Sequence, residues 1–395
     1  MAGDQPRPGQ PQSRRSRRRP AIAPLLLGGL VVVVLLLVPI SSLLTVARMP
    51  MLRPMGMPMP WAQQQEQRPL LSSLDRQSPL WRRGLVIRTG IHLENVYDLS
   101  LKDKTYSADG RLWLEWPQPV QDFIERDALQ PLQLIDFVNQ VQDWEGDIVA
   151  DHTRPVQRGD RWFQSYHFSS QFYLHALNLH RYPFNELTLP LTLQVNPLHA
   201  ELAGRPLLLE PTPNQPGIIG EYASLDGYQL HRAVLIPQLR TYRTDFGQGQ
   251  TVRVSQLAVQ LQYSPSFWPA FIAFLLPLII ILVMVLISPY LEGSLGDVRI
   301  AIPSTALLTL VFLQQGYNAN LPPSPYLTYL DRLYAVSYLI CLALFVLFAW
   351  TSNVYQRTPD EQRSAVVRQL DVYDKHFQVA ALAMLLVVSL EAWLY

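Results

Sequence analysis

The amino-acid sequence predicts an extracellular all-β sandwich, immunoglobulin-like and of about ten strands, followed by an all-α domain of four transmembrane helices. Short runs of alternating apolar residues, separated by turn signals, fill the chain from about residue 82 to 263. After residue 263, apolar segments close to the ~20 residues that cross a bilayer follow one another in quick succession. The two parts of the chain therefore belong to different fold classes.

The first 79 residues precede the predicted sandwich. Residues 1–47 comprise a basic N-terminus with five arginines between positions 14 and 19, then an extra apolar helix at Leu25–Leu44. A cleaved signal peptide and an uncleaved anchor both fit this pattern, and the apolar stretch exceeds the usual signal core of about 7–15 residues, which favours the anchor. Residues 48–79 are rich in proline, methionine and glutamine and are predicted to form a linker.

The sandwich is expected to span residues 80–263 as one domain, because regularly spaced short strands are typical of this architecture. The predicted strands are Val86–Leu93, Thr105–Trp116, Arg161–Phe172, Leu187–Val195, Tyr228–Arg243 and Thr251–Tyr263. Hairpins are predicted where turn dipeptides occur, at Gly-Asp 159–160, Asp-Gly 109–110 and 226–227, and Gly-Gln-Gly 247–249.

The transmembrane domain is expected at residues 264–395. Its predicted helices are at about 266–288, 297–317, 326–351 and 377–395. The polar stretch between the last two, 353–376, carries Arg357, Arg363, Arg368 and Lys375 and is predicted to be a cytoplasmic loop. The sandwich would then lie outside, which predicts a multi-pass protein of the cell membrane with an extracellular or periplasmic domain.

One helical face in the second apolar segment mixes polar and apolar residues. Its members recur at intervals of three or four residues: Asp297, Ala301, Thr305, Leu308, Phe312, Gln315 and Ala319. In an ordinary buried helix the acidic and polar members would be costly, whereas a water-filled axis between several subunits would satisfy them. The competing interpretation is a stripe packed inside one subunit.

Composition and motifs exclude several functions. The formal net charge is +1, so no strong field favours a nucleic-acid partner. The chain has no G-x-S-x-G, H-E-x-x-H or P-loop pattern, so we expect no enzyme and no catalytic residues. Its single cysteine, Cys341, lies in an apolar segment and cannot build a cysteine metal site. No metal or other cofactor is expected.

Four sequence features together resemble the pentameric ligand-gated ion channels, the superfamily of Cys-loop receptors. The run Leu177–Asn185, with Tyr-Pro-Phe-Asn at its end, is similar to the tip of the signature loop. The linker Asn320–Tyr329, the pore segment with Thr305, Leu308 and Thr309, and the strand Ala108–Trp116 also match. His175 and Leu189 stand where the eukaryotic members have cysteines, so the chain is similar to the cysteine-free prokaryotic branch.

The resemblance implies a subunit of a homopentameric ligand-gated channel in a lipid bilayer. It implies that the stripe lines the pore, where an Asp297 ring would favour permeant cations and Leu308 and Phe312 would close the pore by dewetting. Pro303 departs from the family and should bend the pore helix. The resemblance also implies a coupling interface formed by Arg181, Tyr182, Pro183, Phe184, Asn185, Leu321, Pro322 and Tyr326, with Asp98 and Glu94 as further charged candidates.

The agonist is expected to be a small molecule or protons acting on the extracellular domain. Amine-binding relatives use an aromatic cage, whose central tryptophan position is Asn196 or the nearby His199 here. Candidate aromatic residues for a ligand site are Trp144, Trp162, Tyr242 and Phe246. The alternative function is a non-conducting, membrane-anchored β-sandwich sensor or receptor, in which the helices only assemble subunits.

Overall fold

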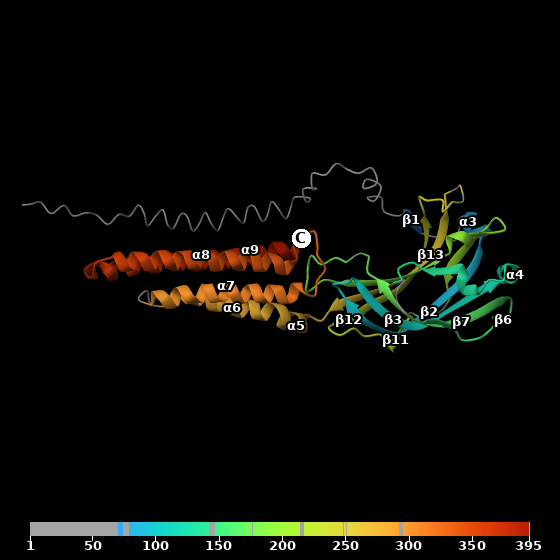
Figure 1. Cartoon of the computed structure of the whole chain (residues 1–395), viewed down its shortest axis with the longest axis horizontal. Helices are drawn as coiled ribbons and strands as arrows, with labels where there is room; N and C mark the ends of the chain where they lie inside the picture. The colour runs from blue at the N-terminus through green and yellow to red at the C-terminus, as the bar shows by residue number, and fades with distance from the viewer. Residues whose placement is uncertain are drawn as a thin grey trace, which may run out of the picture.

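The computed structural model describes residues 70–73, 79–141, 147–175, 177–213, 217–247, 249, 251–291 and 295–394. A large β-sandwich and four long helices lie end to end along the molecule (Figure 1). The predicted signal or anchor segment 1–47 and most of the linker 48–79 lie outside the described residues. The choice between a signal peptide and an anchor therefore stays a prediction.

One layer of the sandwich is an antiparallel sheet. Its strand order is β1 (Leu70–Ser73), β12 (Tyr228–Thr241), β13 (Arg253–Pro265), β8 (Leu187–Val195) and β4 (Ile135–Phe137). The long strands β12 and β13 pair on either side of the predicted Gly-Gln-Gly hairpin, where Gly247 and Gly249 take positive φ values. That hairpin is confirmed, and glycine suits it because it adopts positive φ without steric cost.

The other layer is a mixed sheet, in which β10 and β11 run parallel to β2. Its main path is β5 (Asp147–Ala150), β7 (Arg161–Tyr173), β3 (Thr105–Pro117), β2 (Leu85–Ser100), β10 (Arg205–Pro211) and β9 (Glu201–Leu202), with β6 (Val156–Arg158) on β7 and β11 (Ile219–Tyr222) on β2. All six predicted strands occur, and the remaining described strands are seven residues long or shorter.

The alternating sequence pattern places the sandwich core. In β8, Leu187, Leu189, Leu191 and Leu193 are buried, whereas Thr188 between them is exposed. This is the period-two burial of a strand with one face toward a core. The largest fully buried side chains of the core include Trp116, Tyr106, Phe168 and Phe172. Short helices cap the sandwich: α3 (Pro79–Arg83), α4 (Gln118–Arg126), η1 (Pro131–Leu134) and η2 (Pro197–His199).

The hairpin predicted at Asp109-Gly110 is wrong, because both residues lie inside β3. Opposite them, the pairing of β2 shifts register between Leu93 and Asn95, which is a β-bulge. A Cβ at position 110 would lie 2.1 Å from the carbonyl oxygen of His92. Glycine is therefore required by the close approach of the neighbouring strand rather than by a turn.

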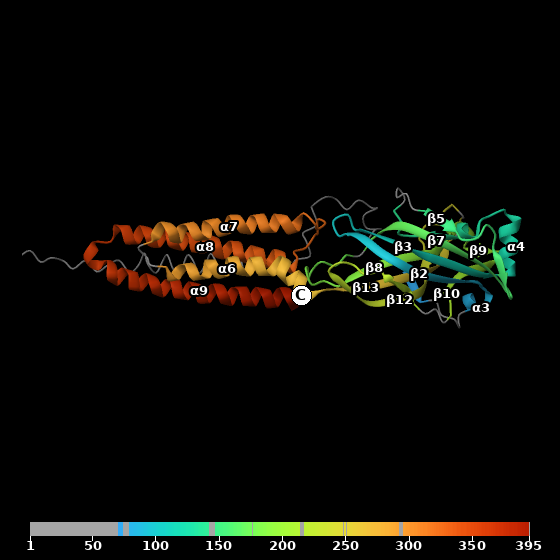
Figure 2. The same cartoon turned by 90° about the horizontal axis from the view of Figure 1, so that it is seen from below.

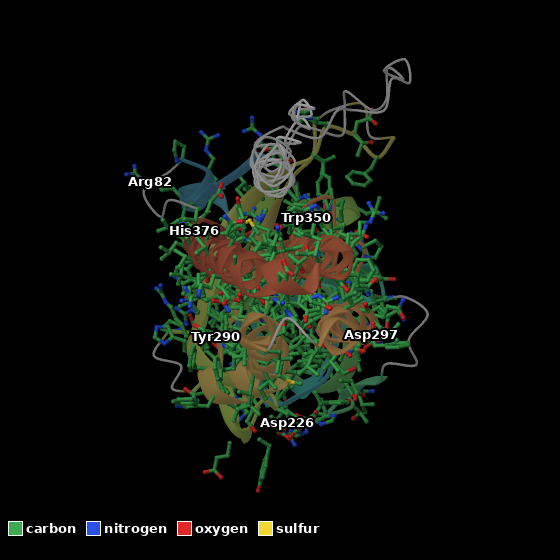
Figure 3. All side chains as sticks on the ribbon, turned by 90° about the vertical axis from the view of Figure 1, so that its left-hand side faces the viewer. Arg82, Asp226, Tyr290, Asp297, Trp350 and His376 are labelled. Carbon is green, nitrogen blue, oxygen red and sulfur yellow. The ribbon has the colours of Figure 1, made fainter. Side chains whose placement is uncertain are left out.

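Four helical segments in the described part of the chain are long and apolar enough to cross a membrane. Their elements are α5 (Phe267–Ala270), η3 (Phe271–Leu275), α6 (Leu276–Ile287) and η4 (Ser288–Tyr290) in the first, then α7 (Gly296–Asn318), α8 (Tyr329–Arg357), and η5 (Asp360–Gln362) with α9 (Arg363–Leu394). The π-helical η3 ends two residues before Pro277, which cannot donate a backbone hydrogen bond. Helices α8 and α9 pack side by side, over α6 and α7 (Figures 1 and 3).

The polar stretch 353–376 is mostly helical, which corrects the predicted loop. Helix α8 continues to Arg357, and α9 already begins at Arg363. The charged side chains of this stretch hide an amphipathic pattern, because the buried residues of α9 recur every three or four positions: Leu370, Asp374, Phe377, Ala381, Met384, Val388 and Ala392. The last helix is thus about 14 residues longer at its start than expected from hydropathy.

Candidate functional site: the exposed face of α7 and the junction loop

The first candidate site is one face of α7. All seven residues of the predicted stripe are exposed in the single chain: Asp297, Ala301, Thr305, Leu308, Phe312, Gln315 and Ala319. Leu308 and Phe312 are apolar and still 57% and 63% exposed. The stripe is therefore not packed inside the described bundle of this chain, which was the competing interpretation.

The opposite face of α7 packs against the bundle. Its buried residues are Arg299, Pro303, Ala306, Leu310 and Tyr317. Their spacing places them on one side of the helix, away from the stripe. Pro303, predicted to disturb the helix, lies on this packed side, and α7 is assigned as one continuous helix through it.

Three hydroxyls on the exposed side of α7 are oriented by their own helix. Ser304, Thr305 and Thr309 each donate to the carbonyl oxygen four residues earlier, at 2.8, 2.9 and 2.9 Å. Because each hydroxyl proton is engaged by the backbone, the oxygen lone pairs remain available as acceptors. Outward-facing acceptor oxygens are the chemistry that a partly dehydrated cation needs.

The acidic end of the stripe lies far from the sandwich. Helix α7 begins at the end of the bundle opposite the sandwich (Figure 1), and Asp297 is its second residue. The nearby Arg299 is buried, pairs with Asp374 of α9 and lies over the Phe348 ring of α8. The charge of Arg299 is compensated by Asp374, and no described residue forms an ion pair with the exposed Asp297 carboxylate.

The second candidate site is the junction loop, which we define as residues 177–185. Leu179 and Tyr182 of this loop are buried in the same hydrophobic cluster as the helices, not in the sandwich core. The Tyr182 ring lies 5.4 Å from the ring of Phe274 and 6.3 Å from that of Tyr317. The Tyr182–Pro183 peptide bond is cis. The loop thus contacts both the first helical segment and the end of α7.

The linker between α7 and α8 holds the junction loop through Tyr326. Its hydroxyl accepts from the Leu179 amide at 2.9 Å and donates to the Leu177 carbonyl at 3.2 Å. The His180 ring stacks on the Tyr326 ring at 3.8 Å, and the His180 carbonyl accepts from the Tyr329 amide at 2.8 Å. Leu321 and Pro322, also predicted here, are buried.

The other end of the junction loop reaches α5 and α9. Phe184 lies 5.2 Å from the Phe267 ring and 5.9 Å from the Trp393 ring, and Arg181 lies 5.7 Å above Trp393. Asn185 is buried, and neither of its amide atoms has a hydrogen-bond partner among the described residues. The predicted loop residues are therefore gathered at one junction that touches all four helical segments.

Of the two charged residues expected to join this contact, only Asp98 lies near it. Asp98 lines a cleft of about 680 Å³ together with Tyr182 of the loop and Asn320 of the linker. Glu94 instead lies 3.5 Å from Arg111 of the neighbouring strand β3. The expectation for Glu94 was therefore wrong, because Glu94 is the extra residue of the bulge in β2 and its side chain lies on the sheet face near Arg111.

The predicted ligand-site residues do not form a single cage. Trp144 lies outside the described residues. Trp162 donates to Gln118 at 2.8 Å, and the His199 ring lies 5.8 Å from the Phe123 ring.

Three other predicted ligand-site residues lie closer to a groove. Tyr242 and Phe246 pack edge to face at 5.0 Å, and Tyr242 donates to Gln194 at 2.8 Å. Asn196 donates to Asp136 at 3.3 Å. Tyr242, Gln194 and Asp136 all line this groove.

The groove has a volume of about 720 Å³ and includes residues that sequence reasoning missed. Arg240 lines it and lies 4.4 Å above the Tyr242 ring, and Asp136 lies on the adjacent side. Burial raises the pKa of the Asp136 carboxyl, which hydrogen bonds from Asn196 and Gln194 partly offset. No sequence signal marks these residues, because β4 and β12 are far apart in the sequence and come to line one groove only in the folded sheet.

Comparison with protein-family models gives no match for this chain, and comparison with curated proteins gives none either.

Proposed function

We propose that this chain is one subunit of a homopentameric ligand-gated ion channel whose pore is lined by the exposed face of α7. The observation that carries the proposal is the exposure of the whole stripe in a helix that could cross a membrane. Helix α7 is the least apolar of the four candidate spans, yet only 22% of the residues in its most apolar 18-residue stretch are buried in the chain.

Lipid is a poor environment for this face. Asp297, Thr305 and Gln315 would meet hydrocarbon or headgroups if α7 faced the bilayer, and polar groups inside a membrane are costly unless they meet water or partners. Copies of the chain arranged around an axis would turn all these faces toward a shared aqueous path. This arrangement satisfies the polar residues without any rearrangement of the bundle.

The order of residues along the stripe supports cation conduction. A ring of Asp297 carboxylates at one mouth would attract cations, and the outward oxygens of Thr305 would replace part of their hydration. Rings of Leu308 and Phe312 further along would close the path by dewetting. The basic residues near Arg357 and Arg363 support a cytoplasmic position for this mouth, with the sandwich outside.

The junction loop would carry the signal from the sandwich to the pore. Tyr182 packs beside Tyr317 at the end of α7, so a shift of the loop displaces the pore helix directly. A small molecule or protons acting on the extracellular domain would supply that shift. The runner-up, a non-conducting sensor, predicts the same contacts without ion flux.

The test is flux through purified protein in liposomes, compared between the wild type and Asp297→Asn. We expect cation flux in the wild type. In the variant, the reversal potential of the current should move from the equilibrium potential of the cation toward that of the anion. The matched control is Asp371→Asn, because Asp371 is also exposed but lies on α9, off the stripe. Unchanged selectivity in Asp297→Asn would refute the pore assignment. Five-fold particles without flux under any agonist or pH would favour the sensor.

A further inference from the structure

A group of metal-binding side chains lies on the mixed sheet, away from both candidate sites. Glu94, Asp109 and His167 come from the three adjacent strands β2, β3 and β7, which Figure 2 shows side by side. Each offers a ligand atom, and these atoms all lie within 4.8 Å of one another. The three side chains are partly buried and lie on the sheet face that points away from the sandwich core.

A β-bulge in β2 brings the Glu94 side chain to this face. Glu94 is the extra residue of the bulge in β2, opposite Gly110 of β3. The absence of a side chain at Gly110 lets the two backbones approach, since a Cβ there would collide with the His92 carbonyl. Bulges re-aim side chains relative to regular strand alternation. As a result, Glu94 joins Asp109 and His167 on one face.

The donor atoms are only partly used within the chain. One carboxylate oxygen of Asp109 accepts from Asn95 at 2.9 Å, which orients the carboxylate, and its other oxygen accepts no hydrogen bond from a described residue. The His167 imidazole has no hydrogen bond to any described residue, so its ring nitrogens remain available. This arrangement, with a supporting hydrogen bond behind a ligand, is common at metal sites.

The charges around the cluster also favour a cation. The Arg111 guanidinium lies 3.5 Å from the Glu94 carboxylate and 3.1 Å from that of Asp151. The Ser165 hydroxyl also donates a hydrogen bond to Asp151. Asp151 gives the guanidinium a closer partner than Glu94 does. Glu94, Asp109 and Asp151 together carry two more charges than the guanidinium of Arg111 compensates, which matches the charge of one divalent ion.

We propose that Glu94, Asp109 and His167 bind a divalent transition-metal ion, zinc in particular. One imidazole and two carboxylates form a donor set that zinc accepts, at bond lengths of about 2.0–2.2 Å and with a fourth position for water. In a tetrahedral site with such bonds the ligand atoms lie about 3.4 Å from one another, so small side-chain rotations that move them roughly 1 Å closer would complete the site. The ion would tie three strands of the mixed sheet together. The site lies within one chain and does not depend on the proposed channel.

Calorimetric titration of the purified full-length chain with zinc chloride tests this proposal. We expect one zinc ion per chain whose affinity falls at least about tenfold in His167→Ala. Asp109→Asn should show the same loss, and it keeps the side-chain size and the contact with Asn95. The matched control is His231→Ala, an exposed histidine on β12 of the other sheet, which should bind zinc like the wild type.

A second readout separates metal binding from damage to the fold. Zinc should raise the thermal unfolding midpoint of the wild type, because a ligand that binds only the folded state stabilises it. The metal-free midpoint of Asp109→Asn should match the wild type, and zinc should no longer raise it. Equal zinc affinity in wild type, His167→Ala and Asp109→Asn would overturn the proposal. So would calcium binding as tight as zinc binding at these residues, because calcium does not favour imidazole.

Discussion

The β-sandwich completes its core within one chain, whereas the helical domain leaves much apolar surface uncovered. Trp116, Tyr106 and Phe168 of the sandwich are almost fully buried. In α6, by contrast, Ile280 and Met284 are 52% and 62% exposed. A sandwich of this kind buries its large apolar side chains within one chain. The helices need a bilayer, partner subunits or both to cover their apolar side chains.

Helices α6 and α7 differ in the chemistry of their exposed faces. The uncovered surface of α6 is apolar, as a lipid-facing surface should be. The uncovered face of α7 alternates Asp297, Thr305 and Gln315 with Leu308 and Phe312. The two exposed faces of the bundle therefore differ in chemistry, and in the proposed channel α6 would face lipid and α7 a shared polar path. The predictions below test this difference between packed and uncovered faces.

The largest effect is expected for the ion pair that fixes the base of α7. Arg299→Ala leaves the Asp374 carboxylate buried without its partner, which typically costs about 3–5 kcal/mol. Unfolding in detergent, followed by helical circular dichroism, should show that loss. The matched control is Arg363→Ala, because its partner Asp360 is 85% exposed and such surface pairs contribute little.

A double variant sharpens this prediction. Replacing both charges, with Arg299→Met and Asp374→Leu together, removes the buried charge altogether. Much of the stability should return, because well-packed apolar residues can replace a buried pair without loss. A stability of the double variant as low as that of Arg299→Ala would show that the unpaired Asp374 carboxylate is not the cause of the loss.

The second effect compares two leucines on opposite faces of α7. Leu310 is fully buried, so Leu310→Ala should lower the free energy of unfolding by about 2–5 kcal/mol through lost packing and a cavity. Leu308 is 57% exposed, so Leu308→Ala should change it by less than about 0.5 kcal/mol. In liposomes Leu308→Ala should have the larger effect on ion flux of the two variants. It should increase basal flux because it weakens the proposed apolar ring. Equal destabilisation by both variants would show that the stripe is packed.

These results also show what could be predicted from the sequence. The six long strands and the α7 stripe follow from simple periodicity, because burial on one face imposes a repeat that survives in the residues. The short strands β5, β6 and β9 are too brief to carry such a repeat. Asp109-Gly110 has the composition of a turn, but its glycine serves a close strand contact that only the paired fold creates.

The limits at the candidate sites have the same physical origin. The junction loop could be located by its sequence pattern, but its contacts with Trp393 depend on where α9 ends in space. Arg240 and Asp136 face one groove because β12 and β4 belong to one sheet. The start of α9 was missed because its charged residues dominate local hydropathy, although its buried positions keep a helical spacing.

The smallest effect concerns the pH dependence of the junction between the two domains. Burial, with a smaller contribution from the charge of Arg332, lowers the pKa of the His180 imidazole below its ordinary value of 6.5. The folded junction therefore favours neutral His180, stacked on Tyr326. The stabilisation is fully present above about pH 6.5 and is lost as the pH falls through the lowered pKa, since the unfolded chain then binds more protons.

The variant His180→Phe keeps an aromatic ring on Tyr326 but cannot titrate. Unfolding midpoints measured from pH 7.5 down to 4.5 should fall less steeply for this variant than for the wild type, and the difference isolates His180 from the other titrating groups. His231→Gln, on an exposed strand position, should leave the wild-type slope unchanged. Parallel profiles for His180→Phe and the wild type would show that the junction holds the imidazole equally well in both charge states, and that acid does not act there.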